Sequence, residues 1–323
     1  MRRPRTRMKI RVLGSAAGGG FPQWNCNCRN CAGLRAGTLR ARARTQSSIA
    51  VHAGGSPDGV AGAESASSWA LVNASPDILV QLRAHPDLQP ARSPRDTAIC
   101  AVVLVDGQVD HTTGLYMLRE SVRPWPVWCT DAVYADLTRG NPIIEVLSHY
   151  CRIERRPMSL DGSGFAIDGV PELRWHALPV AGKPAPYSPN RNSPVPGDNV
   201  ALVITDERSR RAALYAPGLG AVSEPIRRAM ESAACVLVDG TFWSDEEMLL
   251  LGLSRKRARD MGHLALSGPG GILEWLGRLP ATTRKILIHV NNTNPILDED
   301  SPERAELGRR GIEVAWDGME IDL

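Results

Sequence analysis

The segment from Asp106 to Thr112 most constrains the fold, because it places metal-binding side chains between a buried strand and a helix. The apolar run 99–105 (ICAVVLV) predicts a buried strand, and residues 114–120 predict a helix directly after it. Layered α/β folds hold ligands and metals at the carboxyl ends of such strands. The carboxylates, amide and imidazole of this loop therefore form a candidate coordination cluster. The competing interpretation is an acidic turn in which Asp110 or Thr112 caps the helix.

The length and composition of the chain suit one large α/β core. It has 323 residues, and 43% of them are hydrophobic. The net charge of +3 is too small to indicate a nucleic-acid partner, and much of it comes from residues 1–7 (MRRPRTR). No apolar run approaches the length of a membrane span, so we expect a soluble, cytoplasmic protein. We expect residues 1–7 to be a disordered basic extension and residues 8–323 to form one domain.

The seven cysteines fall into two groups. Three lie close together in the spacing C-x-C-x-x-C: Cys26, Cys28 and Cys31. Three thiolates at this spacing can converge on one tetrahedral zinc ion, and a fourth ligand would close the site as a structural one. The alternatives are a redox pair between Cys28 and Cys31, or unremarkable surface thiols. The other four cysteines have apolar neighbours and are expected in the core: Cys100, Cys129, Cys151 and Cys235.

Short apolar segments alternate with glycine-rich or proline-rich loops along the chain. Strands are predicted at residues 10–13, 48–52, 69–73, 99–105, 126–129, 173–178, 200–205, 212–216, 235–238 and 285–289. Helices are predicted at residues 114–121, 131–139, 143–149, 223–232 and 270–279. The loops 54–68 and 182–197 look long and irregular. The second is rich in proline and is either a flap over a substrate pocket or a plain surface loop.

Two more predicted strands end in metal-binding residues. The strand 235–238 leads into Asp239, and the strand ending at Ile288 leads into His289. With the 106–112 loop, three strands then deliver a carboxylate or imidazole where they leave a sheet, which favours one shared site. His263 precedes a helix and is a candidate outer partner or catalytic proton donor.

The order of these features resembles the pyrroloquinoline quinone (PQQ) biosynthesis protein B family. The resemblance runs from Met8 to Leu323 and rests on five segments: 13–31 (LGSAAGGGFPQWNCNCRNC), 109–115 (VDHTTGL), 238–243 (VDGTFW), 288–297 (IHVNNTNPIL) and 317–321 (DGMEI). The family is a distant branch of the metallo-β-lactamase superfamily. The resemblance therefore implies an α/β fold, a four-layer αββα sandwich, with the metal at one edge of its two sheets.

The chain departs from the superfamily signature H-x-H-x-D-H. Asp106 and Gln108 stand where that signature has histidines, whereas Asp110 and His111 match it. We expect a carboxylate-rich metal site, and such a donor set prefers iron(II) or manganese(II) over the zinc of a dinuclear hydrolase. The predicted active-site ligands are Asp106, Asp110, His111, Asp239 and His289.

The family is associated with oxidation of the tyrosine-derived ring in a cross-linked glutamate-tyrosine intermediate of PQQ synthesis. The resemblance thus implies an iron-dependent oxygenase whose partner is this precursor, with His263 or a cation near Lys183 holding its carboxylates. Two alternatives stay open: a soluble carrier of PQQ or its precursor towards the periplasm, and a metal-dependent hydrolase.

The cysteine trio matches an insertion in a related cyclic phosphodiesterase, where a histidine closes the zinc site. The corresponding residue here is Asn292, three residues after His289, and asparagine is a weak zinc ligand. We therefore predict structural zinc at Cys26, Cys28 and Cys31, with the weak donor Asn292 in the fourth position. Such a site also suits a subunit interface in a homodimer.

Overall fold

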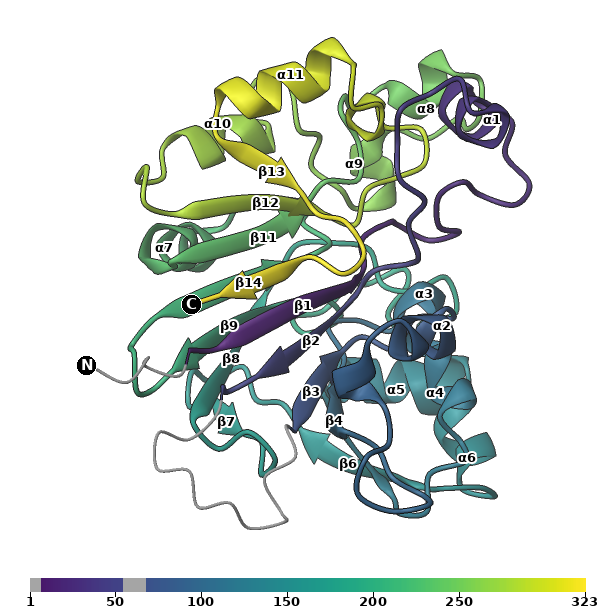
Figure 1. Cartoon of the computed structure of the whole chain (residues 1–323), viewed down its shortest axis with the longest axis vertical. Helices are drawn as coiled ribbons and strands as arrows, with labels where there is room; N and C mark the ends of the chain where they lie inside the picture. Colours follow the sequence, from purple (N-terminus) through teal and green to yellow (C-terminus); the bar gives the residue numbers. More distant parts are fainter. Residues whose placement is uncertain (1–6, 55–67) are drawn as a thin grey trace.

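Two seven-stranded sheets form the framework of the molecule (Figure 1). The computed structural model describes residues 7–54 and 68–323. The first sheet has the order β14 (Glu320–Asp322), β1 (Lys9–Gly14), β2 (Ser48–His52), β3 (Trp69–Val72), β4 (Ile99–Val103), β5 (Trp125–Cys129) and β6 (Ile153–Pro157). The second has the order β13 (Ile312–Val314), β12 (Arg284–Ile288), β11 (Cys235–Asp239), β10 (Ala212–Ala216), β9 (Val200–Asp206), β8 (Leu173–Pro179) and β7 (Phe165–Ala166).

Short helices accompany both sheets. Those in the first half of the chain are α1 (Arg29–Ala36), α2 (Ile78–Arg83), η1 (Pro86–Leu88), α3 (Val109–Thr112), α4 (Gly114–Met117), α5 (Asp131–Ala135), η2 (Asp136–Gly140) and α6 (Ile143–Leu147). Those in the second half are α7 (Glu224–Ser232), α8 (Glu247–Leu250), α9 (Ala258–Met261), α10 (Ile272–Gly277), η3 (Pro295–Leu297) and α11 (Pro302–Arg309). Figure 1 shows α2, α4, α5 and α6 beside the first sheet, and α7, α10 and α11 beside the second.

Successive side chains along a strand point to opposite faces of the sheet, and so they pack in different layers of the sandwich. In β11, Cys235 and Leu237 point into the apolar core between the sheets, whereas Val236 and Val238 pack with the helices outside the second sheet. A strand buried on both faces must be apolar throughout, which is why this segment reads as an unbroken hydrophobic run. The four-layer αββα sandwich predicted from the sequence is confirmed.

The carboxyl ends of the central strands meet at one edge of the sandwich. Strands β3 to β6 are parallel to one another, and so are strands β10 to β13. Backbone hydrogen bonds join the two sheets there: the amide of Val200 donates to Val105 at 2.9 Å, and the amide of Ala17 donates to Val290 at 3.0 Å. Loops that leave β4, β11 and β12 are therefore held close together.

Several sequence expectations concern loops. The segment 182–197 forms turns with no helix or strand, as predicted. Most of the predicted loop 54–68, and nearly all of the predicted basic extension 1–7, lie outside the described residues. Among the helices that the structure describes, none has both the length and the apolar character needed to cross a membrane.

Candidate metal centre

A cavity of about 230 Å³ opens at the edge where the two sheets meet. Side chains from three strand ends line it: Asp106, Asp110 and His111 follow β4, Thr241 follows β11, and His289 follows β12. The sequence predicted Asp239 rather than Thr241 at the end of β11, and Asp239 does not line the cavity. Asp110 and His111 lie in the single turn of α3, whereas the sequence predicted a loop up to residue 113. This turn directs both side chains towards the second sheet.

Asp110, His111 and His289 converge on one point. The Oδ2 atom of Asp110 lies 3.3 Å from Nε2 of His289 and 3.9 Å from Nε2 of His111. One donor atom from each of the three residues lies within 4.8 Å of the others. Two imidazoles and one carboxylate are a donor set that suits divalent iron, manganese or zinc.

Asp106 takes a different position from the one predicted. Its carboxylate accepts a hydrogen bond from Nδ1 of His111, with both oxygens at 2.8 to 2.9 Å, and so it faces the far side of the ring. It is not among the described groups whose donor atoms converge. The carboxylate therefore fixes the His111 tautomer and leaves Nε2 facing the cavity.

Asp239, His263 and His289 form a second convergent group that shares His289 with the first. The Oδ2 atom of the fully buried Asp239 accepts from Nδ1 of His263 at 2.7 Å and from the amide of Leu219 at 2.8 Å. Burial alone would raise the pKa of Asp239, but the adjacent His263 lowers it below its usual value. Asp239 is thus held as a carboxylate behind the cavity.

Thr241 was not predicted from the sequence, yet it connects both groups. Its hydroxyl donates to Oδ1 of Asp239 at 2.6 Å and lies 2.9 Å from Nδ1 of His289. The same hydroxyl also lies 2.9 Å from the backbone oxygen of His289. With its proton donated to Asp239, the threonine oxygen can accept from Nδ1 of His289, and Nε2 of His289 then faces Asp110. The hint in the sequence was the position of Thr241, two residues after Asp239.

These residues fit a bound cation. The Nε2 atom of His111 is buried and has no hydrogen-bond partner in the described part of the chain, which is unusual for a buried polar atom. Burial would lower the pKa of His111, but Asp106 and Asp110 outweigh it and raise the pKa to about 9. The site thus favours positive charge at Nε2, and a metal ion can supply that charge in place of the proton.

The backbone at His289 is also unusual. Its φ is +60°, in the left-handed region that residues other than glycine rarely adopt. Such a conformation costs on the order of 1 to 3 kcal/mol and is found most often at functional sites. Here it turns the imidazole from the end of β12 towards α3.

The cysteine trio forms a separate cluster. The sulfur atoms of Cys26, Cys28 and Cys31 lie within 4.8 Å of one another. The buried amide of Asn292 faces all three, with Nδ2 at 3.0, 3.6 and 3.3 Å from the respective sulfurs. A 180° rotation of this amide would present Oδ1 instead, so Asn292 occupies the position of a fourth donor. The predicted structural zinc ligands are therefore together.

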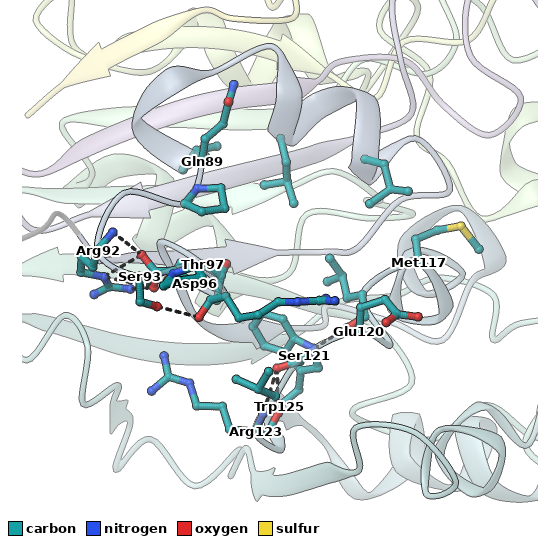
Figure 2. Close-up of a pocket in the computed structure, with 18 of the residues that line it drawn as sticks. Gln89, Arg92, Ser93, Asp96, Thr97, Met117, Glu120, Ser121, Arg123 and Trp125 are labelled. Atoms are coloured by element: carbon teal, nitrogen blue, oxygen red, sulfur yellow. Dashed lines mark hydrogen bonds and ion pairs between the residues drawn. The ribbon is translucent and has the colours of Figure 1, made fainter.

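A larger cavity of about 730 Å³ lies away from these residues, between the η1 loop and the segment after α4 (Figure 2). Figure 2 shows Arg92 paired with Asp96 on one side, and Met117 and Trp125 elsewhere on the wall. None of its described lining residues is a histidine or a cysteine. The chemistry, rather than the size, therefore assigns the candidate site to the smaller cavity.

The αββα sandwich and the histidine and carboxylate cluster at its edge define a metal-binding protein of the metallo-β-lactamase class. The family model described as "Beta-lactamase superfamily domain" matches residues 68–290. At 15% identity, a diphosphatase of the PhnP family shares the fold with a TM-score of 0.64 over 98% of this chain and 97% of that one.

Proteins with higher sequence identity to this chain identify its family within this class. Coenzyme PQQ synthesis protein B of Azoarcus sp. (strain BH72) is 61% identical over 98% of this chain and 100% of its own length. The protein of the same name from Pseudomonas aeruginosa (strain PAO1) is 57% identical over 98% of this chain and 100% of its own. The zinc-bound crystal structure of PqqB from Methylobacterium extorquens is 35% identical, with a TM-score of 0.83 over 98% of this chain and 100% of that one. The chain belongs to the coenzyme PQQ synthesis protein B family.

Proposed function

We propose that this protein is a metal-dependent oxygenase that hydroxylates the tyrosine-derived ring of a cross-linked glutamate-tyrosine precursor. Its place in PQQ synthesis follows from its family. The observation that carries the finer proposal is the convergence of Asp110, His111 and His289, since two histidines and a carboxylate form the ligand set of non-haem iron oxygenases. Iron(II) held by these residues would supply the redox chemistry for dioxygen, and an external reductant would provide the two electrons that release the second oxygen atom as water.

The residues around the ligands have separate tasks. Asp106 orients His111 through Nδ1, and Thr241 orients His289 in the same way. His263 also lines the cavity, and its bond to Asp239 raises its pKa against the effect of burial. A histidine held in this way can donate a proton to an oxygen of the substrate. We assign the proton transfer to His263.

The compartment and the domain organisation also belong to the proposal. None of the seven cysteines, all of which lie in the described residues, forms a disulfide, and this supports the proposal of a reducing, cytoplasmic environment. Strand β14, near the carboxyl end, pairs with β1, near the amino end. This pairing supports one domain over residues 8–323, because the two ends of the chain complete the same sheet.

The test is an oxygen-incorporation experiment. Protein freed of metal is loaded without oxygen with iron(II) or with zinc, mixed with the cross-linked glutamate-tyrosine dipeptide and a two-electron reductant such as ascorbate, and exposed to labelled dioxygen. The reductant supplies the electrons that convert the second oxygen atom to water. We expect label in the product of the iron-loaded protein, none with zinc, and a rate lower by about 10² or more in His263→Ala. Dipeptide binding without incorporation would favour the carrier, and cleavage by the zinc-loaded protein would favour the hydrolase.

A further inference from the structure

Gln108 replaces a histidine of the superfamily signature, and the structure gives its side chain another task. Its Nε2 atom donates a hydrogen bond to the backbone oxygen of Lys183 at 3.1 Å. The amide thereby joins the turn before α3 to the segment 181–199, which runs along the cavity. The amide nitrogen of Gln108 is therefore engaged with the loop backbone.

Other contacts hold the same segment in place. The amide of Gly220 donates to the oxygen of Ala181 at 2.7 Å, and the hydroxyl of Tyr187 donates to the oxygen of Gly107. A Cβ atom on Gly262 would lie only 2.8 Å from the amide nitrogen of Lys183, so the two backbones are in direct contact. The backbone at Lys183 is thus fixed from both sides of the cavity, and its side chain keeps its freedom.

Lys183 is the one lysine or arginine among the described residues that line this cavity. It is exposed, and within the described ranges no carboxylate lies within 4.0 Å of its ammonium group. The amide of Asn199 lines the cavity beside it, about 3.1 Å from where a side chain on Gly182 would begin. A cation and an amide at the rim of a metal cavity suit a carboxylate group of a ligand.

We infer that Lys183 and Asn199 form a subsite for a carboxylate of the substrate, and that Gln108 is a positioning residue that sets Lys183 for this contact. This inference depends on the proposed function in one respect: it assumes that the ligand is an aromatic polycarboxylate. The metal ligands would then place the ring, while Lys183 would bind a carboxylate at its periphery. Gln108 acts through the backbone of Lys183.

The test measures binding without turnover. Finished PQQ, itself an aromatic polycarboxylate, is titrated without oxygen into manganese-loaded wild type, Lys183→Met, Gln108→Ala, the double variant and Lys256→Met. Lys256 is an exposed lysine that does not line the cavity and serves as the matched control. We expect Lys183→Met to raise the dissociation constant about tenfold or more, because a charge-assisted hydrogen bond is lost.

Whether Gln108 acts by positioning Lys183 is tested by comparing the single variants with the double variant. Gln108→Ala should weaken PQQ binding several-fold in the wild-type background and have no further effect in Lys183→Met, because both changes remove the same contact. All variants should keep the manganese content of the wild type. Salt should weaken binding to the wild type more than binding to Lys183→Met.

Several outcomes would overturn the inference. Loss of manganese in Gln108→Ala would make Gln108 a metal ligand, and additive effects would remove the coupling. Unchanged binding in Lys183→Met, or no binding of PQQ by the wild type, would remove the subsite. Because Lys183 is exposed, its variant tests the subsite even where Gln108→Ala fails to fold. A protein that binds PQQ through Lys183 but incorporates no oxygen would refute the oxygenase and leave this subsite standing.

Discussion

At the scale of single residues, the metal site depends on which nitrogen of each histidine faces the cavity. Asp106 accepts from Nδ1 of His111, and Thr241 occupies the same position at His289. Both Nε2 atoms therefore face Asp110. A carboxylate behind a ligating histidine fixes its orientation and makes the ring a stronger donor.

This geometry predicts the effect of removing Asp106. We expect Asp106→Ala to weaken metal binding at the active site by about 10- to 100-fold, because His111 loses its orienting partner and keeps its Nε2. His111→Ala should lose tight binding altogether. Anaerobic titration with manganese(II) measures both, and Asp131→Ala, an exposed carboxylate, is the control. Equal losses in the two variants would instead make Asp106 a direct ligand.

At the scale of elements, strands were predicted correctly where burial makes the sequence apolar. Every predicted strand is present to within a residue or two, because strands buried on both faces read as apolar runs. The charged edge strand β6 (IERRP) and the short strands β7, β13 and β14 were missed, since none of them shows such a run. The predicted helix 114–121 was too long, because α4 ends at Met117.

In the candidate site, too, some features were predictable from the sequence and others were not. The proximity of Asp110, His111, Asp239 and His289 was predictable, because Asp239 and His289 lie at the ends of β11 and β12 and the turn α3 follows β4 at the same edge. The pairing of Asp106 with Nδ1 of His111, and of Gln108 with Lys183, was not predictable. The first pairing depends on side-chain rotamers within one loop, and the second also depends on a loop that is distant in the sequence. Neither pairing leaves a periodic signal.

Glu247, at the start of α8, gives a prediction about pH. It is buried, its carboxylate accepts hydrogen bonds from the amide of Trp243 and the hydroxyl of Thr293, and burial raises its pKa from 4.5 to about 7. The folded protein therefore holds this proton more tightly than the unfolded chain does. Stability is unaffected below pH 4.5, falls as the pH rises from 4.5 to 7, and stays lower above pH 7.

The corresponding variant is Glu247→Gln, which keeps the hydrogen-bond acceptor and cannot ionise. We expect the wild type to lose about 3 kcal/mol relative to this variant between pH 4.5 and pH 8. Urea unfolding at both pH values measures the difference, and Glu274→Gln, on an exposed part of α10, is the control. A difference that does not change with pH would contradict the raised pKa.

The cysteine loop before α1 gives a prediction about the second metal. A closed zinc site contributes its binding energy to folding, so Cys28→Ser should lose zinc and unfold at a lower temperature. The active site should still load manganese, because its ligands belong to other segments. Elemental analysis and thermal unfolding measure both effects, with Cys100→Ser as the control. Full zinc content and unchanged stability in Cys28→Ser would contradict a structural site.

At the scale of the whole molecule, the active site joins the two sheets. Asp110 and His111 lie in α3, which follows β4 of the first sheet, whereas His289 follows β12 of the second. A cation held between these groups connects the two halves of the sandwich, and the unfolded chain offers no comparable site. Metal binding at the active site should therefore stabilise the entire fold.

This stabilisation can be separated from that of the cysteine site by the choice of metal. Manganese(II) prefers oxygen and imidazole donors to thiolates, so it should act at the active site alone. At about 100 times its dissociation constant it should stabilise the fold by about 2.7 kcal/mol, which raises the unfolding temperature by several degrees. Cys28→Ser should show the same increase, because its active site is intact, and His289→Ala should show none. An equal increase in His289→Ala would place the stabilising ion elsewhere, and no increase in the wild type would mean that these ligands do not join the sheets through a metal.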